Sequence, residues 1–594
     1  MTISDKLSAL RRLMSDRDLS AYIIPSEDFH GSEYVGEHFK TREFMSGFTG
    51  SAGTLLVMND CAFLWTDGRY FLQAAEQLYS SGIKLMKAGE AGVPTITDFL
   101  ASNLAYNSKL GFDGRVINSA LADKFAAALK NKNIKFCTDE DLVDKIWKDR
   151  PEISSEKVWE LNKKYAGNRH EKLERVRSAL KKESCDLLLV AAPEEIAWLL
   201  GLRGNDVACT PVFLSFMLIS TGKAELFANG NIFDSEIKKS LSDDNIVLEP
   251  YSAVYREAQH DSIGKRVWFD PARTNYSLVQ CLGEAKMTIK KPTPIELMKA
   301  VKSNAEQDGM RKAHVLDSVA CTKFIFWLKT HVGKEKITEL SAAEKLLEFR
   351  KAQDGFIEES FETIMAYGPH GAIVHYIPTE KTECEILPCG LCLIDSGAHY
   401  AFGTTDITRT VVLGKLTDEE RRAFTLVMKG HLRLSSVKFK YGCGGGAVDC
   451  FAREPLWENG LDYNHGTGHG VGFILSVHEG PQRIHWNSPN KAIPFEPGMI
   501  TSNEPGFYSA GKFGIRHENL VLCVEKENSE YGRFLGFENL TVVPFDTAGL
   551  DIDLLDETEK ELLNDYHAKV RETISPYLAP EEKLWLEKAT AMIK

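Results

Sequence analysis

The chain has 594 residues, of which 43% are hydrophobic and 26% are charged; these ordinary globular values exclude a small disulfide-stapled module and a disordered or fibrous polymer. Its 71 Lys and Arg residues are outnumbered by 84 Asp and Glu residues, so the net charge of -13 gives no attraction to nucleic-acid phosphates or anionic membranes. We therefore expect a protein of several domains with no nucleic acid and no membrane as partner.

The amino terminus reaches charged residues at once and lacks the apolar run of roughly 7–15 residues that a secretory signal needs. The most apolar stretches, 187–190 and 211–219, are much shorter than the roughly 20 residues that cross a bilayer. The 12 cysteines show no repeated spacing, as is typical of free thiols in a reducing compartment. These features together predict a cytoplasmic protein.

Two segments in the first half of the chain are similar to each other, with Asp5 aligned to Glu171 and Ala21 aligned to Leu187. Both begin with apolar residues at helical spacing and continue into a short apolar strand. The pattern predicts two similar α/β domains at 1–155 and 156–293, with the polar, proline-containing segment 149–156 as the linker. The apolar residues of the two predicted helices are Leu7, Leu10 and Met14, and Leu173, Val176 and Leu180.

A third domain is predicted at 294–594, after the proline-containing segment 290–294. Strand-like runs in its central part alternate with glycine-rich turns, so the expected fold class is α/β (α+β). The helical patterns lie at 295–301, 305–332, 554–570 and 580–586, and the strand-like runs at 391–394, 408–412 and 520–524.

The densest group of chemically capable residues begins with two aspartates. Asp395 ends one predicted strand and Asp406 begins the next, so a hairpin would bring both carboxylates to one face of a sheet. Two close carboxylates repel each other unless one is protonated or a cation lies between them. Asp395 alone is more typical of a turn, whereas the pair favours a metal.

Two histidines and two glutamates follow. His465 and His469 stand among glycines, and Glu504 and Glu518 flank a second predicted turn. Either histidine alone is more typical of a surface or core position, but with the aspartates the group forms an oxygen-rich set with one nitrogen ligand. Such a set suits two divalent ions bridged by carboxylates, with manganese, cobalt or zinc fitting better than copper or calcium.

The motifs DSGAHY, TTDITRT, HGTGHGVG, VHEGPQ, SNEPGFY and GIRHEN resemble, in this order, the signature of the pita-bread metallopeptidases. The chain is more closely similar to the cytosolic aminopeptidase P (Xaa-Pro aminopeptidase) group, through FMSGFTGSAGT, WTDGRYFLQAAEQL, EEIAWLLGLRGNDV, GPHGAIVHY and PEEKLWL. The resemblance implies two creatinase-like α/β domains, a pita-bread catalytic domain with a C-terminal extension, and a homodimer.

The resemblance also implies a site with two metal ions, usually manganese. Asp406 and Glu518 would bridge the ions, Asp395 would complete one metal site, and His469 and Glu504 would complete the other. Histidines at three further positions match substrate-binding and proton-handling residues, and Arg516 is expected to bind substrate with them. These histidines are His375, His465 and His478.

The implied reaction is hydrolysis of the bond between an N-terminal residue and a penultimate proline, by a hydroxide that bridges the two ions. Glu504 would take the proton and pass it to the leaving nitrogen. One alternative is a prolidase-type dipeptidase, and another is a pita-bread binding module without catalysis. The extra leading domain favours aminopeptidase P over prolidase, and the five complete ligand positions disfavour an inactive module.

Some positions differ from the family pattern or carry competing signals. His370 stands where asparagine is more usual and His517 where an aliphatic residue is common, and neither replaces a ligand. His517 alternates to the strand face opposite Glu518, which favours a packing role. Cys389 and Cys392 have the spacing of a zinc or redox pair without a partner pair, so we expect a buried structural cysteine instead.

Overall fold

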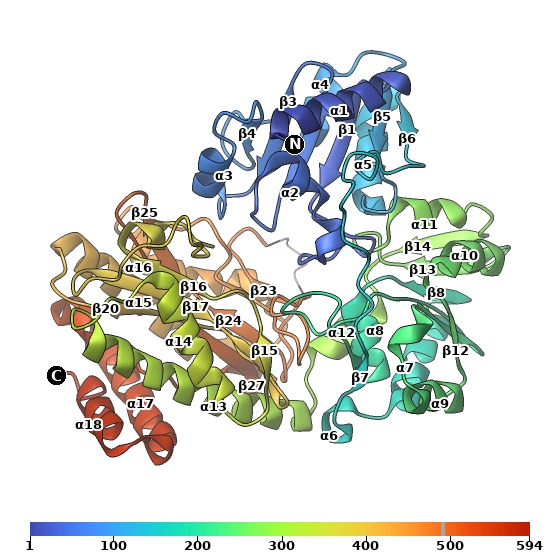
Figure 1. The fold of residues 1–594 in the computed structure, drawn as a ribbon. Helices are drawn as coiled ribbons and strands as arrows, with labels where there is room; N and C mark the ends of the chain where they lie inside the picture. Colours follow the sequence, from blue (N-terminus) through green and yellow to red (C-terminus); the bar gives the residue numbers. More distant parts are fainter. Residues whose placement is uncertain (489–492) are drawn as a thin grey trace. The chain divides into compact units, whose positions relative to one another are not determined.

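The computed structural model describes residues 1–488 and 493–594, and its contacts divide the chain into two units, Met1–Glu296 and Leu297–Lys594 (Figure 1). Each unit has hydrophobic cores of its own. Among the residues described, the structure has no helix with the length and apolar character needed to cross a bilayer.

The unit Met1–Glu296 contains two six-stranded sheets with the same strand order and directions, β4-β3-β2-β1-β5-β6 and β12-β11-β10-β8-β13-β14. In each, the central strand pairs antiparallel on one side and parallel on the other. The strands of the first sheet are β1 (Ala21–Pro25), β2 (Thr54–Met58), β3 (Ala62–Thr66), β4 (Lys84–Lys87), β5 (Lys109–Phe112) and β6 (Lys135–Cys137). Those of the second are β8 (Leu187–Val190), β10 (Phe216–Ser220), β11 (Ala224–Ala228), β12 (Ile246–Pro250), β13 (Arg266–Phe269) and β14 (Met287–Lys290).

The helices that precede the central strands repeat as well. Helices α1 (Ile3–Asp16) and α7 (Arg169–Lys182) have the same length, and each begins at a residue whose side chain accepts a backbone N–H, Thr2 and Asn168. The apolar residues predicted to face the core of each domain are buried. The prediction of two similar α/β domains is therefore confirmed.

The unit Leu297–Lys594 packs helices against short antiparallel sheets, ordered β16-β17-β20, β15-β18-β19 and β21-β28-β27-β24, with two-stranded pairs β22-β23 and β25-β26 (Figure 1). The strands that carry the candidate site are β16 (Ile364–Tyr367), β17 (Leu391–Ser396), β20 (Ile407–Val412), β22 (Gly468–His469), β24 (Ile500–Asn503), β25 (Gly506–Ser509), β26 (Phe513–Arg516) and β27 (Asn519–Ser529). The others are β15 (Phe356–Glu359), β18 (Ala398–Tyr400), β19 (Gly403–Thr404), β21 (Lys438–Lys440), β23 (Arg483–Ile484) and β28 (Gly532–Asn539).

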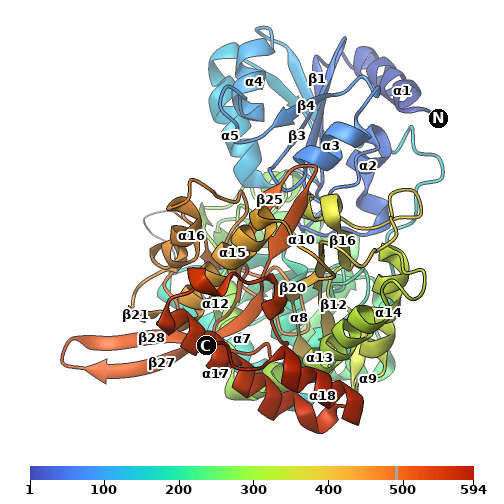
Figure 2. The same cartoon turned by 90° about the vertical axis from the view of Figure 1, so that its left-hand side faces the viewer.

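Two helix pairs hold these strands in place. Phe324 and Leu328 of α13 (Asn304–His331) and Leu346 of α14 (Glu339–Lys351) belong to the same buried cluster as Ile394 of β17. Helix α15 (Asp418–Ser436) contacts α16 (Asp449–Trp457) and packs on Ile515 of β26. The ends of β27 and β28 project from the rest of this unit (Figure 2). The buried helix faces therefore fix the strands that carry the site residues.

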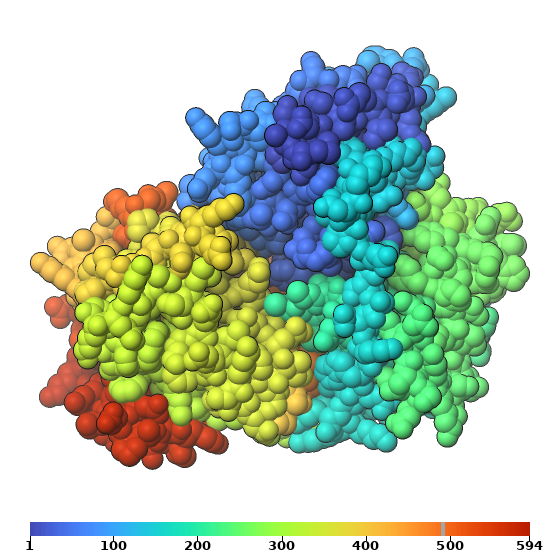
Figure 3. Space-filling model, in the orientation of Figure 1, coloured from blue at the N-terminus to red at the C-terminus, as the bar shows by residue number. Residues whose placement is uncertain are grey.

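The last two helices, α17 (Glu557–Ile574) and α18 (Pro580–Ala589), belong to the same core. Val570, Ile574 and Leu586 are buried in the cluster that includes α15. In the space-filling view these C-terminal residues, coloured red, lie against a yellow-green surface (Figure 3), and both helices contact α13. The C-terminal extension is thus packed into the unit Leu297–Lys594.

A buried histidine makes this packing sensitive to acid. Phe545 N–H donates to His567 Nε2 at 3.2 Å, and burial, assisted by Arg409 and Arg571, lowers the pKa of His567 to about 3. Below the ordinary pKa of about 6.5 the unfolded chain takes up a proton that the folded chain does not, so stability is complete above that pH and falls toward pH 3. We expect His567 to account for a loss of about 2 kcal/mol between pH 7 and pH 5. Thermal unfolding of His567→Gln, whose side chain can still accept the Phe545 N–H, should show a smaller drop in Tm between these pH values than the wild type; an equal drop would contradict the assignment.

Candidate metal centre

The two aspartates lie on neighbouring strands. Asp395 in β17 is opposite Thr408 of β20, and Asp406 stands two residues before Thr408, so both carboxylates face the same side of the sheet. Both are buried. The chain between them is not the simple turn that we expected, because β18 and β19 pair with each other there and β18 pairs with β15.

The two glutamates lie where one strand ladder passes into another. The β24-β27 pairing ends at Asn503 opposite Asn519, and the β25-β26 pairing begins at Gly506 opposite Arg516. Glu504 and Glu518 fall between these two pairs, on facing chain segments. The strand pattern therefore brings the two glutamates across from each other.

Glu518 and His469 connect the two carboxylate pairs. Thr408 Oγ1 donates to Glu518 Oε2 at 2.6 Å, which ties the glutamates to the strand that follows Asp406. His469 Nε2 lies 3.3 Å from Asp406 Oδ2 and 3.4 Å from Glu504 Oε1. Ligand atoms of Asp406, His469 and Glu518 all lie within 4.8 Å of one another.

The electrostatics of this cluster call for a cation. Burial and the neighbouring carboxylates, Asp406 first among them, raise the pKa of Glu518 well above its ordinary value. Burial also raises the pKa of Asp395, although Arg516 acts against it, and Asp395 Oδ1 is buried without a hydrogen-bond partner in the described part of the chain. Crowded carboxylates, an orphaned oxygen and one imidazole are a donor set that fits a pair of hard or borderline divalent ions.

The pKa of His469 also indicates that the cluster favours a cation. Burial lowers the pKa of this imidazole, but the hydrogen bond to Asp406 and the charge of Glu504 outweigh it and raise the pKa to about 9. A positive charge is thus favoured at the centre of the carboxylates. The side chains of His469 and Glu504 are 21% and 16% exposed, whereas Glu518 is 1% exposed, so the cluster is reached from the side of His469 and Glu504.

A chain of hydrogen bonds continues outward from Asp395. Arg516 Nη2 donates to Asp395 Oδ2 at 2.5 Å, and Arg516 Nη1 donates to the Tyr508 hydroxyl at 2.7 Å. The same hydroxyl lies 2.8 Å from His465 Nε2. Tyr508 was not identified from the sequence as a site residue, although the SNEPGFY motif contains it; the contacts of its hydroxyl with His465 and Arg516 are what indicate a role.

The remaining two predicted site residues lie beside this network. The ring of His478 stands edge-on to that of His469, with centroids 4.3 Å apart. His375 follows Val374, whose carbonyl accepts a hydrogen bond from Arg516 Nη2 at 3.4 Å. The structure therefore gathers the nine predicted residues around one cluster, while their individual roles stay predictions.

The competing features play other parts. His517 is 1% exposed and its ring packs edge-on against Phe424 at 4.4 Å, in agreement with the packing interpretation. Cys392 is buried in β17 and Cys389 is exposed. Every cysteine is a free thiol, and burial raises the pKa of Cys392 well above its ordinary value, in agreement with a structural residue.

The Tyr508 hydroxyl should matter for the reaction. Tyr508→Phe removes the hydrogen bonds to His465 and Arg516 but keeps the ring, so we expect kcat to fall by about 10-fold without a change in bound metal. Steady-state kinetics and metal analysis would measure both. Tyr531→Phe is the matched control, since Tyr531 lies on the β27–β28 hairpin and is 73% exposed. A wild-type kcat in Tyr508→Phe would exclude the role.

Family models match almost the whole chain. Residues 308–525 match metallopeptidase family M24 and residues 533–593 match the C-terminal region of peptidase M24. Residues 6–146 and 149–306 each match a creatinase/prolidase N-terminal domain. The two leading domains and the site-bearing unit thus match the parts of one enzyme family.

Relatives extend this similarity over the full length. The chain is 42% identical to Xaa-Pro aminopeptidase 1 of Dictyostelium discoideum, with 97% of this chain and 94% of the relative covered. It is 40% identical to aminopeptidase P2 of Arabidopsis thaliana, with 98% and 88% covered. A solved X-prolyl aminopeptidase from Caenorhabditis elegans, described as a cytosolic enzyme with a di-nuclear active site, superposes with a TM-score of 0.96 at 34% identity and covers 100% of both chains. The chain therefore belongs to the Xaa-Pro aminopeptidases of metallopeptidase family M24.

Proposed function

We propose that the five ligand residues of this chain form the active site with which it removes the N-terminal residue from peptides whose second residue is proline. The chain is a metal-dependent hydrolase of the Xaa-Pro aminopeptidase type, as its full-length relatives are. The observation that carries the proposal is the meeting of Asp406, His469 and Glu518 within 4.8 Å, beside Asp395 and Glu504.

The site is suited to two divalent metal ions. We propose that Asp406 and Glu518 contribute to both ions, Asp395 to one, and His469 and Glu504 to the other. Manganese is the proposed metal, with cobalt and zinc as alternatives, because oxygen donors with one imidazole suit these ions. When bound, such a pair supplies Lewis acidity and lowers the pKa of water, so that hydroxide is available near neutral pH to attack a peptide carbonyl.

The side chains around the ligands handle protons and orient the substrate. Glu504 is exposed toward the open side of the cluster, where its carboxylate can accept a proton from the attacking water and pass it to the leaving proline nitrogen. His375 and His478 would donate hydrogen bonds to the carbonyl oxygen as negative charge develops on it. The hydrogen-bonded path through Tyr508 holds His465 and Arg516 in fixed orientations.

Proline sets a particular requirement on such a site. The bond before proline is a tertiary amide without an N–H, so recognition cannot depend on that donor and needs an apolar surface for the ring. A substrate residue beyond proline distinguishes an aminopeptidase from a dipeptidase. Extended peptides are therefore the proposed substrates.

We also propose the domain boundaries, the location and the oligomeric state. The two matching sheets support domains at 1–155, 156–293 and 294–594. A cytoplasmic location fits the C. elegans relative, which is described as cytosolic. A homodimer is proposed from the resemblance to long members of the family.

The test is an assay of the purified, metal-supplemented chain on an Xaa-Pro dipeptide and on Xaa-Pro-Yaa peptides. Release of the first residue from the longer peptides is expected. Cleavage of the dipeptide alone would identify a dipeptidase, and cleavage of neither would identify an inactive module. Metal content measured on the same samples should give two ions per chain if the site is dinuclear.

A further inference from the structure

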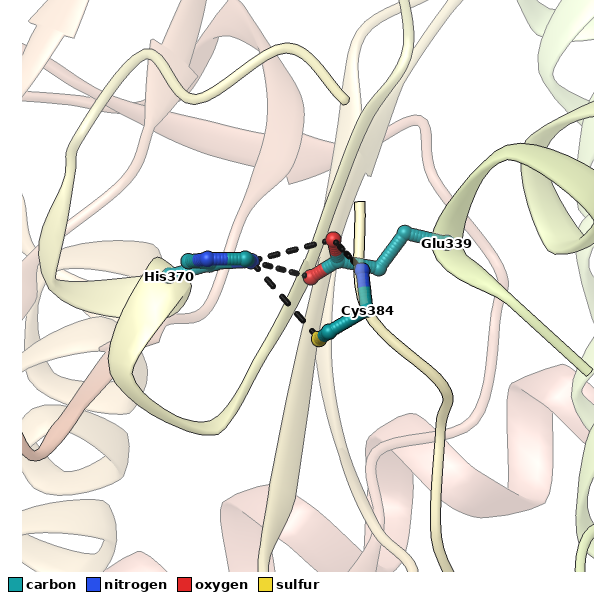
Figure 4. Close-up of side chains that lie close together, drawn as sticks. All are labelled: Glu339, His370 and Cys384. Carbon is teal, nitrogen blue, oxygen red and sulfur yellow. Dashed lines mark hydrogen bonds and ion pairs between the residues drawn. The ribbon is translucent and has the colours of Figure 1, made fainter. Parts of the chain in front are cut away.

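Glu339 lies outside the metal centre and is a buried carboxylate that accepts several hydrogen bonds. It is the first residue of α14 and is 0% exposed. Its Oε1 accepts from Tyr367 N and from His370 Nδ1, both at 2.8 Å. Its Oε2 accepts from the Tyr376 hydroxyl at 2.8 Å and from Cys384 N at 3.1 Å. Four donors spread over 367–384 thus converge on one buried carboxylate. Figure 4 shows two of them, from His370 and from the backbone nitrogen of Cys384.

These donors enclose the segment that carries His375. In this His375 segment, residues 368–377, His370 precedes His375 and Tyr376 immediately follows it. The rings of His370 and Tyr376 stack with centroids 4.3 Å apart. On the other side the segment packs on β26, so closely that a Cβ on Gly371 would come within 2.9 Å of Gly514 N. The His375 segment is therefore held between Glu339 and the strand that bears Arg516.

The same side chains could suggest a further metal site, because Glu339, His370 and Cys384 offer oxygen, nitrogen and sulfur within 4.8 Å (Figure 4). Each oxygen of Glu339 already accepts two hydrogen bonds, and the 2.8 Å separation from His370 Nδ1 is that of a hydrogen bond. Burial and Glu339 raise the pKa of Cys384 to about 12, so the thiol stays protonated. A cation would have to displace these donors and the thiol proton.

We infer that Glu339 is a positioning residue for His375, and that His370 and Tyr376 transmit its effect by fixing the segment on both sides of that histidine. The inference rests on the proposed role of His375 in binding the substrate carbonyl. A buried carboxylate that collects four donors allows few alternative arrangements, since a displaced donor would leave buried charge without a partner. Small displacements of a group that contacts the reacting atoms are costly for the rate.

The atom that His370 uses provides a specific test. The bond to Glu339 is made by Nδ1, the ring nitrogen closest to the backbone, and the amide nitrogen of asparagine occupies a similar position. His370→Asn should therefore keep the bond, whereas His370→Ala removes it. A role in packing alone predicts clear losses in both variants, because neither asparagine nor alanine fills the space of the imidazole.

The experiment measures kcat and KM on an Xaa-Pro-Yaa peptide for these two variants and for Tyr376→Phe. We expect His370→Ala and Tyr376→Phe to lower kcat by about 10-fold with KM within about twofold, and His370→Asn to lie within about threefold of the wild type. Tyr441→Phe is the matched control. The Tyr441 hydroxyl donates to Glu496 at 2.7 Å and is not part of the His375 segment, so kcat and KM of this variant should equal those of the wild type.

A double-mutant cycle decides the mechanism. In a His375→Ala background, His370→Ala should cost less than about twofold in kcat, because the residue through which it acts is gone. Additive losses, or loss of a metal equivalent in His370→Ala, would overturn the inference.

Amide hydrogen exchange gives a readout that is independent of activity. The segment 368–377 should exchange faster in His370→Ala than in the wild type, and at the wild-type rate in His370→Asn. Equal exchange rates in all three proteins would also overturn the inference. If the wild-type protein did not cleave the Xaa-Pro-Yaa peptide, that result would contradict the proposed function and not this inference.

Discussion

Asp406→Ala is expected to lose bound metal and nearly all activity. Asp406 approaches His469 at 3.3 Å and lies beside Asp395 and Glu518, so its removal takes away the proposed ligand common to both ions. We expect kcat/KM to fall by about 10³-fold or more, because several kcal/mol of charge stabilisation in the transition state are lost with the metal. Metal analysis of the purified variant should show fewer ions than in the wild type.

The control for this variant is Asp354→Ala in the same unit. The Asp354 side chain is 78% exposed and lies 3.8 Å from Lys312, so it should leave metal content and activity at wild-type levels. Thermal unfolding of both variants separates loss of ligand from loss of fold. Near-normal activity in folded Asp406→Ala would exclude the two-metal assignment.

Glu504→Gln is expected to give a folded and almost inactive protein. Glutamine keeps the size of the side chain and can still accept the hydrogen bond that Ser502 Oγ donates at 3.1 Å, but it cannot take up the proton. We expect kcat to fall by about 10²–10⁴-fold, as is usual when a general base is removed, while Tm stays near the wild-type value and bound metal, which keeps its other four proposed ligands, falls less than in Asp406→Ala. Steady-state kinetics, metal analysis and thermal unfolding measure the three quantities.

Glu525→Gln serves as the comparison for this change. Glu525 lies on β27 with its side chain 44% exposed, in an ion pair with Arg533, so the same chemical substitution there should not alter kcat. If Glu504→Gln kept more than about a third of the wild-type kcat, Glu504 could not be the group that moves the proton.

Local sequence patterns predicted much of the fold because they record which face of each element is buried. The helical spacing of Leu7, Leu10 and Met14, repeated at Leu173, identified two similar domains before their matching sheets were seen. The segment between Asp395 and Asp406 was predicted less well. Its two extra strands, β18 and β19, pair with each other, and β18 also pairs with β15, a partner far away in the chain that periodicity does not reveal.

The site shows the same division. The motifs around Asp395, His469 and Glu518 were sufficient to name the proposed ligands from the sequence, because each ligand type stands in a recognisable local context. Their convergence depends on pairings such as Asn503 with Asn519, which join distant segments and which only the tertiary structure decides.

The supporting residues depended wholly on the tertiary structure. Tyr508 is one tyrosine among 18 in the sequence, and its role follows from its contacts with His465 and Arg516. Glu339 has no distinctive motif, and in the sequence it is simply a glutamate at a helix start, a common position for that residue. The sequence by itself determined the repeated domains, the order of the proposed ligands and the enzyme family. Only the tertiary structure decided which buried groups hold the site residues, because those hydrogen bonds join segments whose separation along the chain leaves no periodic trace.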